Sequence, residues 1–355
     1  MLESMSSLQM SLAAIGALTV GAVVVYNYWT SRKNEPRQAD PLREPLGSDM
    51  EPVLDTEVVM KPAVGQDPVL DDGFGSLPLP ERKTALDALI DVMALIEVDQ
   101  VVSGDAALAA LPLTRRVGTK LFTVEGLSQE TGLWDSLAPS RRYTAFQAGV
   151  QLANRMGALN NIEFSEFVVK TQAFADAVGG TPSFSDMLEE VSRARELDQF
   201  ASVHDAQLSF TLCARSAAWS PGYIQQHAGR LGFVPGVMPG RMVLPAAEQG
   251  MPPVLVLTFD SQAALADDPA LSAIRSFALS LDVPQTARVD EPFTRLREAS
   301  RLLAEAMDGV VTDGEGQMLN ADALDQIGND LQQLYDALDA RELSAGSPQA
   351  RRLFS

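Results

Sequence analysis

A run of about twenty apolar residues near the N-terminus constrains this chain more than any other feature. The stretch "MSLAAIGALTVGAVVVYNYW", residues 10–29, contains no charged side chain, and as a helix it is long enough to cross the hydrocarbon core of a bilayer. Positive charges follow it at Arg32, Lys33 and Arg37, whereas a secretion signal carries them before its apolar segment. The sequence therefore predicts a permanent transmembrane helix over residues 10–30, with an atypical or uncleaved signal sequence as the alternative.

The distribution of charge predicts the orientation of the chain and excludes some partners. The positive-inside rule leaves residues 1–9 outside the membrane and the bulk of the chain in the cytoplasm. A single cysteine, Cys213, rules out an intrachain disulfide and agrees with a reducing compartment. The formal net charge of −20 argues against nucleic acid, because phosphates are bound by clustered Lys and Arg. Only the cluster of Arg32, Lys33 and Arg37 favours a membrane surface.

Residues 31–80 follow the apolar stretch and are rich in proline and acidic side chains. No helical or alternating period persists there beyond a few residues. Such a composition buries too little apolar surface to offset the entropy of ordering. The sequence therefore predicts a flexible linker, within which short apolar clusters such as Val58 to Met60 are alternative partner-binding segments.

Ordered structure is predicted from about residue 82. Residues 84–99 fit either a helix or a strand, because periodicity alone does not decide. Helices are predicted in "GDAALAAL", "NIEFSEFVVKTQAFADAV" and "TPSFSDMLEEVSRARELDQFA", and strands in "TKLFTVEGL" and "RRYTAFQAGVQLAN". This part of the chain, residues 82–203, reads as an α+β unit.

A similar order of elements follows in residues 204–342. Strands are predicted in "AQLSFTLCARS", "FVPGVMPGRMVL", "PPVLVLTFD" and "RSFALSLDVP", helices in "SPGYIQQHAGRLG", "EPFTRLREASRLLAEAMDG" and "NADALDQIGNDLQQLYDAL", and a hairpin in "GVVTDGEGQML". The sequence predicts two tandem related units, with two unrelated domains as the alternative. Residues 343–355 form a C-terminal tail.

Three pieces of the second unit carry a resemblance to a known family. They are "GFVPGVM" after the first predicted helix, "LDVP" at the end of a strand, and "LLAEAMDGVVTDGEGQMLNADALDQI" near the end. With the membrane helix and proline-rich linker before it, this order of elements resembles the ZipA family of bacterial cell-division proteins. Residues 82–203 match this family only faintly and resemble a diverged duplicate.

The resemblance implies a fold, a function and a place in the cell. The fold is a split β-α-β arrangement, an antiparallel sheet with helices on one face. The function is that of a non-enzymatic adaptor in septation, which holds the division protein FtsZ at the inner membrane. The adaptor itself has its N-terminus in the periplasm and its folded units in the cytoplasm. The open sheet face is an apolar groove for the C-terminal peptide of FtsZ. Carried over by position, the groove residues are Leu208, Phe210, Met238, Thr258 and Ser280.

Two of these positions depart from the family pattern. Thr258 and Ser280 stand where the family places larger or more apolar groups. Either the register is off by one residue, which would bring Val256 or Leu279 to that face, or this groove is more polar. Arg230 and Arg241 are candidates for positive charge beside the groove, and Met238 suits an adaptable binding surface.

Two other function classes stay open from the sequence. One is a membrane-anchored scaffold for a different partner. The other is a hydrolase with Cys213 as nucleophile and His204 or His227 as base, although Cys213 lies in an alternating apolar strand typical of a buried, inert thiol. The sequence holds no metal-ligand motif, and we expect no cofactor, no metal, no nucleic acid and no small-molecule substrate.

Overall fold

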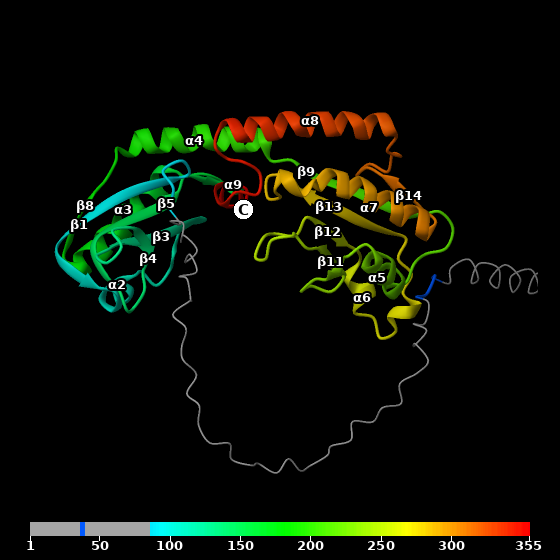
Figure 1. Ribbon diagram of the computed structural model, residues 1–355, viewed down its shortest axis with the longest axis horizontal. Helices are drawn as coiled ribbons and strands as arrows, with labels where there is room; N and C mark the ends of the chain where they lie inside the picture. Colours follow the sequence, from blue (N-terminus) through cyan, green and yellow to red (C-terminus); the bar gives the residue numbers. More distant parts are fainter. Residues whose placement is uncertain (1–35, 40–85) are drawn as a thin grey trace, which may run out of the picture.

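The computed structural model describes residues 36–39 and 86–355 (Figure 1). These residues form an α+β protein with two six-stranded antiparallel sheets, one in each half of the chain, and a small two-stranded sheet. No helix in this part of the chain is long and apolar enough to cross a bilayer. The predicted membrane helix over residues 10–30 lies outside the described residues, as do residues 1–9 and most of the predicted linker.

The first unit runs from β1 to α4. Its strands are β1 Asp91–Ser103, β2 Arg116–Val117, β3 Lys120–Ser128, β4 Trp134–Ser136, β5 Arg142–Gln151, β6 Ala153–Asn154, β7 Gly157–Ala158 and β8 Gly180–Ser183. Its helices are α2 Gly104–Ala110, α3 Asn161–Val178 and α4 Met187–His204. Of the segment that periodicity left open, residues 91–99 belong to strand β1, where alternating apolar residues face the core of this unit, and residues 88–90 form a turn before it.

The second unit runs from β9 to α8, and the chain ends in a short helix, α9. Its strands are β9 Gln207–Ala214, β10 Val234–Pro235, β11 Arg241–Leu244, β12 Leu255–Thr258, β13 Ser276–Asp282 and β14 Gly309–Thr312. The helices are α5 Pro221–Arg230, α6 Ser261–Ala264, α7 Pro292–Met307, α8 Ala321–Ala340 and α9 Pro348–Leu353, with 3-10 turns η1 Pro269–Leu271 and η2 Arg288–Asp290.

The two sheets share a strand order. The first runs β2-β3-β5-β1-β8, with β4 also paired to β3, and the second runs β10-β11-β12-β13-β9-β14. If β1 is matched to β9, then β3-β5-β1-β8 corresponds to β12-β13-β9-β14. In each unit a helix (α3 or α7) joins two strands that flank the first strand of the unit, which is a split β-α-β arrangement.

Local sequence signals explain where the main helices begin. The Asn160 side chain accepts hydrogen bonds from the first turn of α3, and the Glu163 side chain accepts one from the backbone amide of Asn160, which makes a capping box. The Ser220 side chain accepts a hydrogen bond from the Tyr223 amide at the start of α5, with Pro221 in the first helical position. Alternating apolar residues of the strands then face these helices, so the core of each unit lies between its sheet and its helices.

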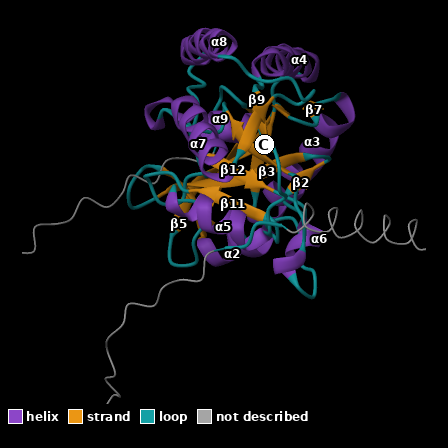
Figure 2. Ribbon diagram, turned by 90° about the vertical axis from the view of Figure 1, so that its right-hand side faces the viewer, coloured by secondary structure: helices purple, strands orange, loops and turns teal. Residues whose placement is uncertain are grey.

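The last helices of the two units lie along the same side of the molecule (Figures 1 and 2). Arg341, just after α8, pairs with Glu196 of α4 at 3.2 Å and places its guanidinium 4.5 Å from the ring centre of Phe200. α4 leads almost directly into β9. These contacts hold the ends of α4 and α8 together.

The C-terminal residues occupy the junction between the units, where the sequence predicted only a tail. Leu353 and Phe354 are buried. Arg352 forms an ion pair with Asp91 of β1, with Nη2 2.6 Å from Oδ1, while Gln285 of the second unit donates to the carbonyl of Phe354. The tail is therefore a helix packed between the two units (Figure 1).

Four residues of the predicted linker are docked rather than free. Residues 36–39 lie against the second unit, where Arg37 forms an isolated bridge with Trp219. The guanidinium of Arg37 forms an ion pair with Asp308. The sequence predicted instead that Arg37 contacts the membrane surface. The prediction of a flexible linker is wrong for these four residues, because their backbone and side chain meet matching groups on the second unit.

Candidate functional site

The second sheet has one face that none of the described helices covers. We define the open face as two rows of side chains across the strands. One row is Arg241, Thr258, Ala278, Thr211 and Thr312, in which Thr312 at the far edge is buried, and the other is Val243, Val256, Ser280 and Ser209. The opposite face carries Phe210, Leu212, Leu257 and Leu279, all buried beneath the helices.

Strand pairing places the predicted groove residues on two different faces. Thr258 and Ser280 lie on the open face, as the sequence predicted. Leu208 and Phe210 do not, because Phe210 pairs with buried Leu279 and Ser209 pairs with Ser280. Phe210 is 3 % exposed and its ring meets Phe293 of α7 edge to face, while Leu208 packs partly buried against the same core.

The open face is more polar than an apolar groove. The Ser209 and Ser280 hydroxyls lie 3.4 Å apart across β9 and β13. Val256 shares this face with Thr258, whereas Leu279 is buried on the other side. A slipped register is therefore the wrong explanation for the polar positions, and the face itself carries hydroxyl groups.

Met238 lies at the edge of the open face, in the loop between β10 and β11. It is 62 % exposed and borders a pocket of about 670 Å³. The apolar wall of this pocket consists of Pro235, Val237, Val243, Pro245, Ala246, Met251 and Pro253. Arg241 lines the pocket too and begins the row of the open face that contains Thr258. The pocket and the open face thus form one continuous surface.

A glycine shapes this loop. Gly240 has a φ of +74°, and a Cβ atom there would lie 2.5 Å from the carbonyl oxygen of Phe259. Only glycine fits such a close approach in the left-handed region. Gly240 therefore brings the Met238 loop down against β12 and sets the position of Arg241.

The alternation of the strands contained the signal that the sequence analysis missed. In β9, Ser209 and Thr211 alternate with buried Phe210 and Leu212, so they face outward with Ser280. Met251 comes from the loop between β11 and β12 and lines the same pocket as Met238. No local sequence pattern indicates that these two loops meet. Arg230 ends α5 on the covered side of the sheet, so of the two predicted charges only Arg241 borders this surface.

The corresponding face of the first sheet is partly covered by the chain itself. The side chain of Leu86 packs on Gly149, where a Cβ atom would lie 2.4 Å from it. Glu125 is 0 % exposed on this face, and it accepts hydrogen bonds from the Leu86 amide at 3.2 Å and from Gln147 at 2.7 Å. The first unit thus has no comparable opening around Gly149.

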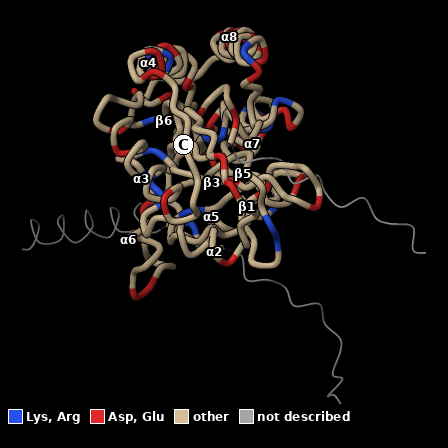
Figure 3. The backbone as a smooth tube through the Cα atoms, turned by 90° about the vertical axis from the view of Figure 1, so that its left-hand side faces the viewer, with Lys and Arg blue, Asp and Glu red and all other residues tan. Residues whose placement is uncertain are grey.

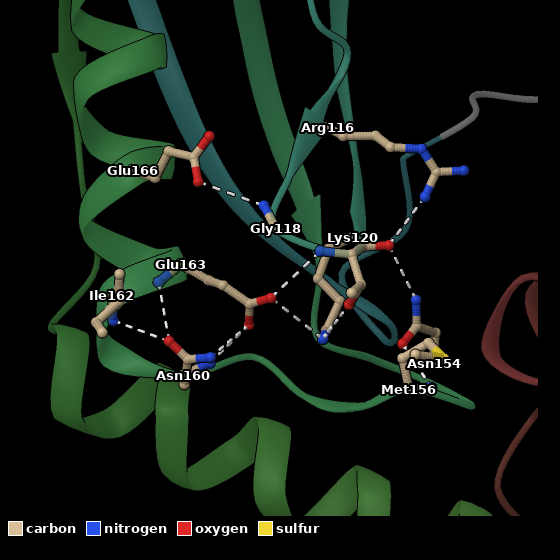
Figure 4. Close-up of polar contacts among 10 residues, drawn as sticks. Arg116, Gly118, Lys120, Asn154, Met156, Asn160, Ile162, Glu163 and Glu166 are labelled. Carbon is tan, nitrogen blue, oxygen red and sulfur yellow. Dashed lines mark hydrogen bonds and ion pairs between the residues drawn. The ribbon is translucent and has the colours of Figure 1, made fainter.

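A second polar cluster lies in the first unit, where β3 meets the start of α3 (Figure 4). Lys120 is buried, and its Nζ lies 3.6 Å from Oε1 of Glu163 and 3.0 Å from the Thr119 hydroxyl. The other carboxylate oxygen of Glu163 accepts from Asn160, as the capping box requires. Gly118 stands beside this carboxylate with a φ of +53°, and a Cβ there would lie 2.3 Å from Oε1. All these charges are satisfied within the protein, so the cluster is a structural link.

The groups considered for catalysis lie apart. Cys213 Sγ lies 3.9 Å from the Thr312 hydroxyl, and Cys213 is on the same side of the sheet as the open face. His227 belongs to α5, on the covered side, and the ring of His204 stacks on Phe200. Among the described residues no group of three or more His, Cys, Asp or Glu side chains could hold a metal ion.

No known family model matches this chain. No curated protein matches its sequence either. The open face and the pocket beside Met238 therefore carry the functional argument by their chemistry alone.

Proposed function

We propose that the chain is a membrane-anchored, non-enzymatic adaptor of bacterial cell division that binds the C-terminal peptide of FtsZ. The observation that carries this proposal is the open face of the second sheet with the apolar pocket at its edge. The order of elements in this unit supports the resemblance to the ZipA family, and we infer that the first unit is a related copy of the second.

The chemistry of the surface fits a short peptide with apolar and acidic residues. The pocket beside Met238 accepts an apolar anchor, since methionine adapts its shape to a ligand. Arg241, exposed between the pocket and the open face, suits a carboxylate of the peptide. The hydroxyl groups of Thr258 and Ser280 offer hydrogen bonds to a peptide lying across the strands.

The predicted membrane helix supplies the anchor in this proposal. It places the protein in the inner membrane, with residues 1–9 in the periplasm and both units in the cytoplasm. A weak contact with one peptide is sufficient there, because FtsZ filaments present many tails and binding becomes multivalent.

A second candidate is a membrane-anchored scaffold for another partner. The hydroxyl-rich open face favours it, because a purely apolar peptide offers no side-chain hydrogen bond to Thr258, Ser280 or Ser209. On the face shown in Figure 3, Lys and Arg positions are scattered among Asp and Glu positions. This pattern and the net charge of −20 disfavour a strongly acidic partner.

The proposal is tested by titrating the full chain, in detergent micelles, with a fluorescent peptide copying the C-terminal tail of FtsZ. We expect micromolar binding, weakened at least tenfold, about 1.4 kcal/mol, by Met238→Asp and by Thr258→Asp. Thr294→Asp is the matched control, because Thr294 is exposed on α7, on the covered side of the sheet. Equal binding by all three variants would place the site elsewhere, and no binding by the folded wild type would favour the scaffold.

A further inference from the structure

Residues 36–39 contact the second unit through both backbone and side chain. The Arg37 amide donates to the Ala218 carbonyl at 2.7 Å, and the Ser220 amide donates to the Arg37 carbonyl at 2.9 Å. These two bonds make Arg37 a one-residue strand beside Trp219, whose other edge pairs with Ile274. Ser220 also caps α5, so the docked segment adjoins the start of that helix.

The guanidinium of Arg37 meets the C-terminal end of α7. Its Nη1 donates to the Met307 carbonyl at 3.0 Å, and its Nη2 lies 2.9 Å from Asp308 Oδ2. The last carbonyls of a helix lack partners within the helix, and a positive charge there is favourable. A hydrogen bond from Ser216, together with the charge of Arg37, lowers the pKa of Asp308. Asp308 therefore stays ionised as the counter-charge of Arg37.

The position of this contact in the sequence gives it a consequence. The predicted membrane helix ends at residue 30, and only residues 31–35 separate it from the docked segment. Fully extended, this connection spans about 20 Å. A free flexible linker over residues 31–80 would instead have a root-mean-square length of about 40 Å and a much longer maximum reach.

We propose that the docking of residues 36–39 holds the second unit close to the bilayer. This inference rests on the membrane anchor of the proposed function. It makes residues 40–85 a connection between the two units, because residue 39 lies on the second unit and residue 86 on the first. The peptide-binding surface is then presented within a short, fixed range of the membrane.

The docking itself is tested by disulfide trapping in the full chain. A Cβ atom at position 222 would lie 3.7 Å from the Cβ of Ala39, a separation typical of disulfides. In a Cys213→Ser background, Ala39→Cys with Gly222→Cys should oxidise quickly and nearly completely. Ala39→Cys with Thr144→Cys, an exposed position of the first unit, should form little disulfide. Equal rates for the two pairs would overturn the docking, whether or not the chain is anchored.

The distance from the membrane is tested in vesicles by energy transfer to labelled lipid headgroups. The donor dye is attached to Ser261→Cys in the Cys213→Ser background. Arg37→Gln should lower the transfer efficiency at least twofold, because the second unit is released to a longer linker. Lys33→Gln removes an equal charge from the same basic cluster and should leave the transfer unchanged.

Two results contradict the inference in different ways. Equal transfer efficiency in Arg37→Gln and Lys33→Gln would show that docking does not set the distance. A wild-type chain that an alkaline wash strips from the vesicles would overturn the anchor of the proposed function, while the disulfide result would still report on the docking.

Discussion

Lys120 is a fully buried cation in the first unit, at 2 % exposure. A buried charge is tolerated only with a close counter-charge and hydrogen bonds. Glu163 supplies the counter-charge, the Thr119 hydroxyl accepts a hydrogen bond from Lys120, and the Glu163 carboxylate also completes the cap of α3. This one side chain therefore links the turn between β2 and β3 to the first turn of the helix.

Loss of the Glu163 carboxylate should destabilise the protein strongly. We expect Glu163→Ala to lower the free energy of unfolding by about 3–5 kcal/mol, because Lys120 is left buried without a counter-charge. Glu166→Ala is the matched control and should cost at most about 1 kcal/mol, since the Glu166–Lys170 pair lies at the surface. Urea unfolding of the full chain followed by circular dichroism measures both.

A double variant separates charge from packing at this site. Lys120→Met with Glu163→Gln removes both charges and should recover part of the stability lost in Glu163→Ala. A double variant as unstable as Glu163→Ala would show that the buried charge is not the cause.

Among the elements, α9 makes the contacts most remote in sequence. It is a six-residue helix, too short to be stable alone, so its structure depends on packing between the units. Phe354, just after it, is 1 % exposed. Gln151 of the first unit donates to the Arg352 carbonyl, and Gln285 of the second unit donates to the Phe354 carbonyl. The helix therefore acts as a wedge that sets the arrangement of the two units.

Truncation of the aromatic anchor of this wedge should loosen the junction. We expect Phe354→Ala to lower the free energy of unfolding by about 3–5 kcal/mol, as for other buried phenylalanines. Ser355→Ala, at the exposed neighbouring position, should stay within about 0.5 kcal/mol of the wild type. Urea unfolding of the full chain measures this difference, and equal stability of the two variants would mean that α9 is not a wedge.

At the scale of the whole molecule, two carboxylates at the junction respond to pH. Burial raises the pKa of Asp91, which pairs with Arg352, and burial raises the pKa of Asp282, which pairs with Arg155. Between the ordinary and the raised pKa values, the folded protein binds protons that the unfolded chain releases. The contribution of both groups to the free energy of unfolding therefore falls as the pH rises through that window.

This linkage predicts a pH dependence of stability that two substitutions reduce. Between about pH 4 and pH 7, the contribution of these groups makes the midpoint temperature of thermal unfolding fall as the pH rises. This fall should be smaller in the double variant Asp91→Asn/Asp282→Asn than in the wild type. Asp322→Asn, at an exposed position of α8, removes a charge away from the junction and should leave the slope unchanged. An identical slope in all these proteins would show that the junction carboxylates do not titrate in this range.

Much of the local structure followed from the sequence by itself. The alternation in β13, the 3.6-residue period of α3 and the Ser220–Pro221 start each predicted an element, because these signals act within a few residues. The order of elements also predicted two similar α+β units, since each pattern repeats along the chain. The α+β class is confirmed, whereas the membrane helix and the FtsZ partner stay predictions.

Only the tertiary structure decided which face each strand presents and where distant segments meet. Phe210 and Ser280 belong to opposite faces because pairing fixes their register, and an alternating pattern does not say which set faces the helices. Arg37 binds Asp308, and Arg352 binds Asp91. Each of these pairs joins residues more than two hundred positions apart, and no local signal in a single sequence specifies such contacts.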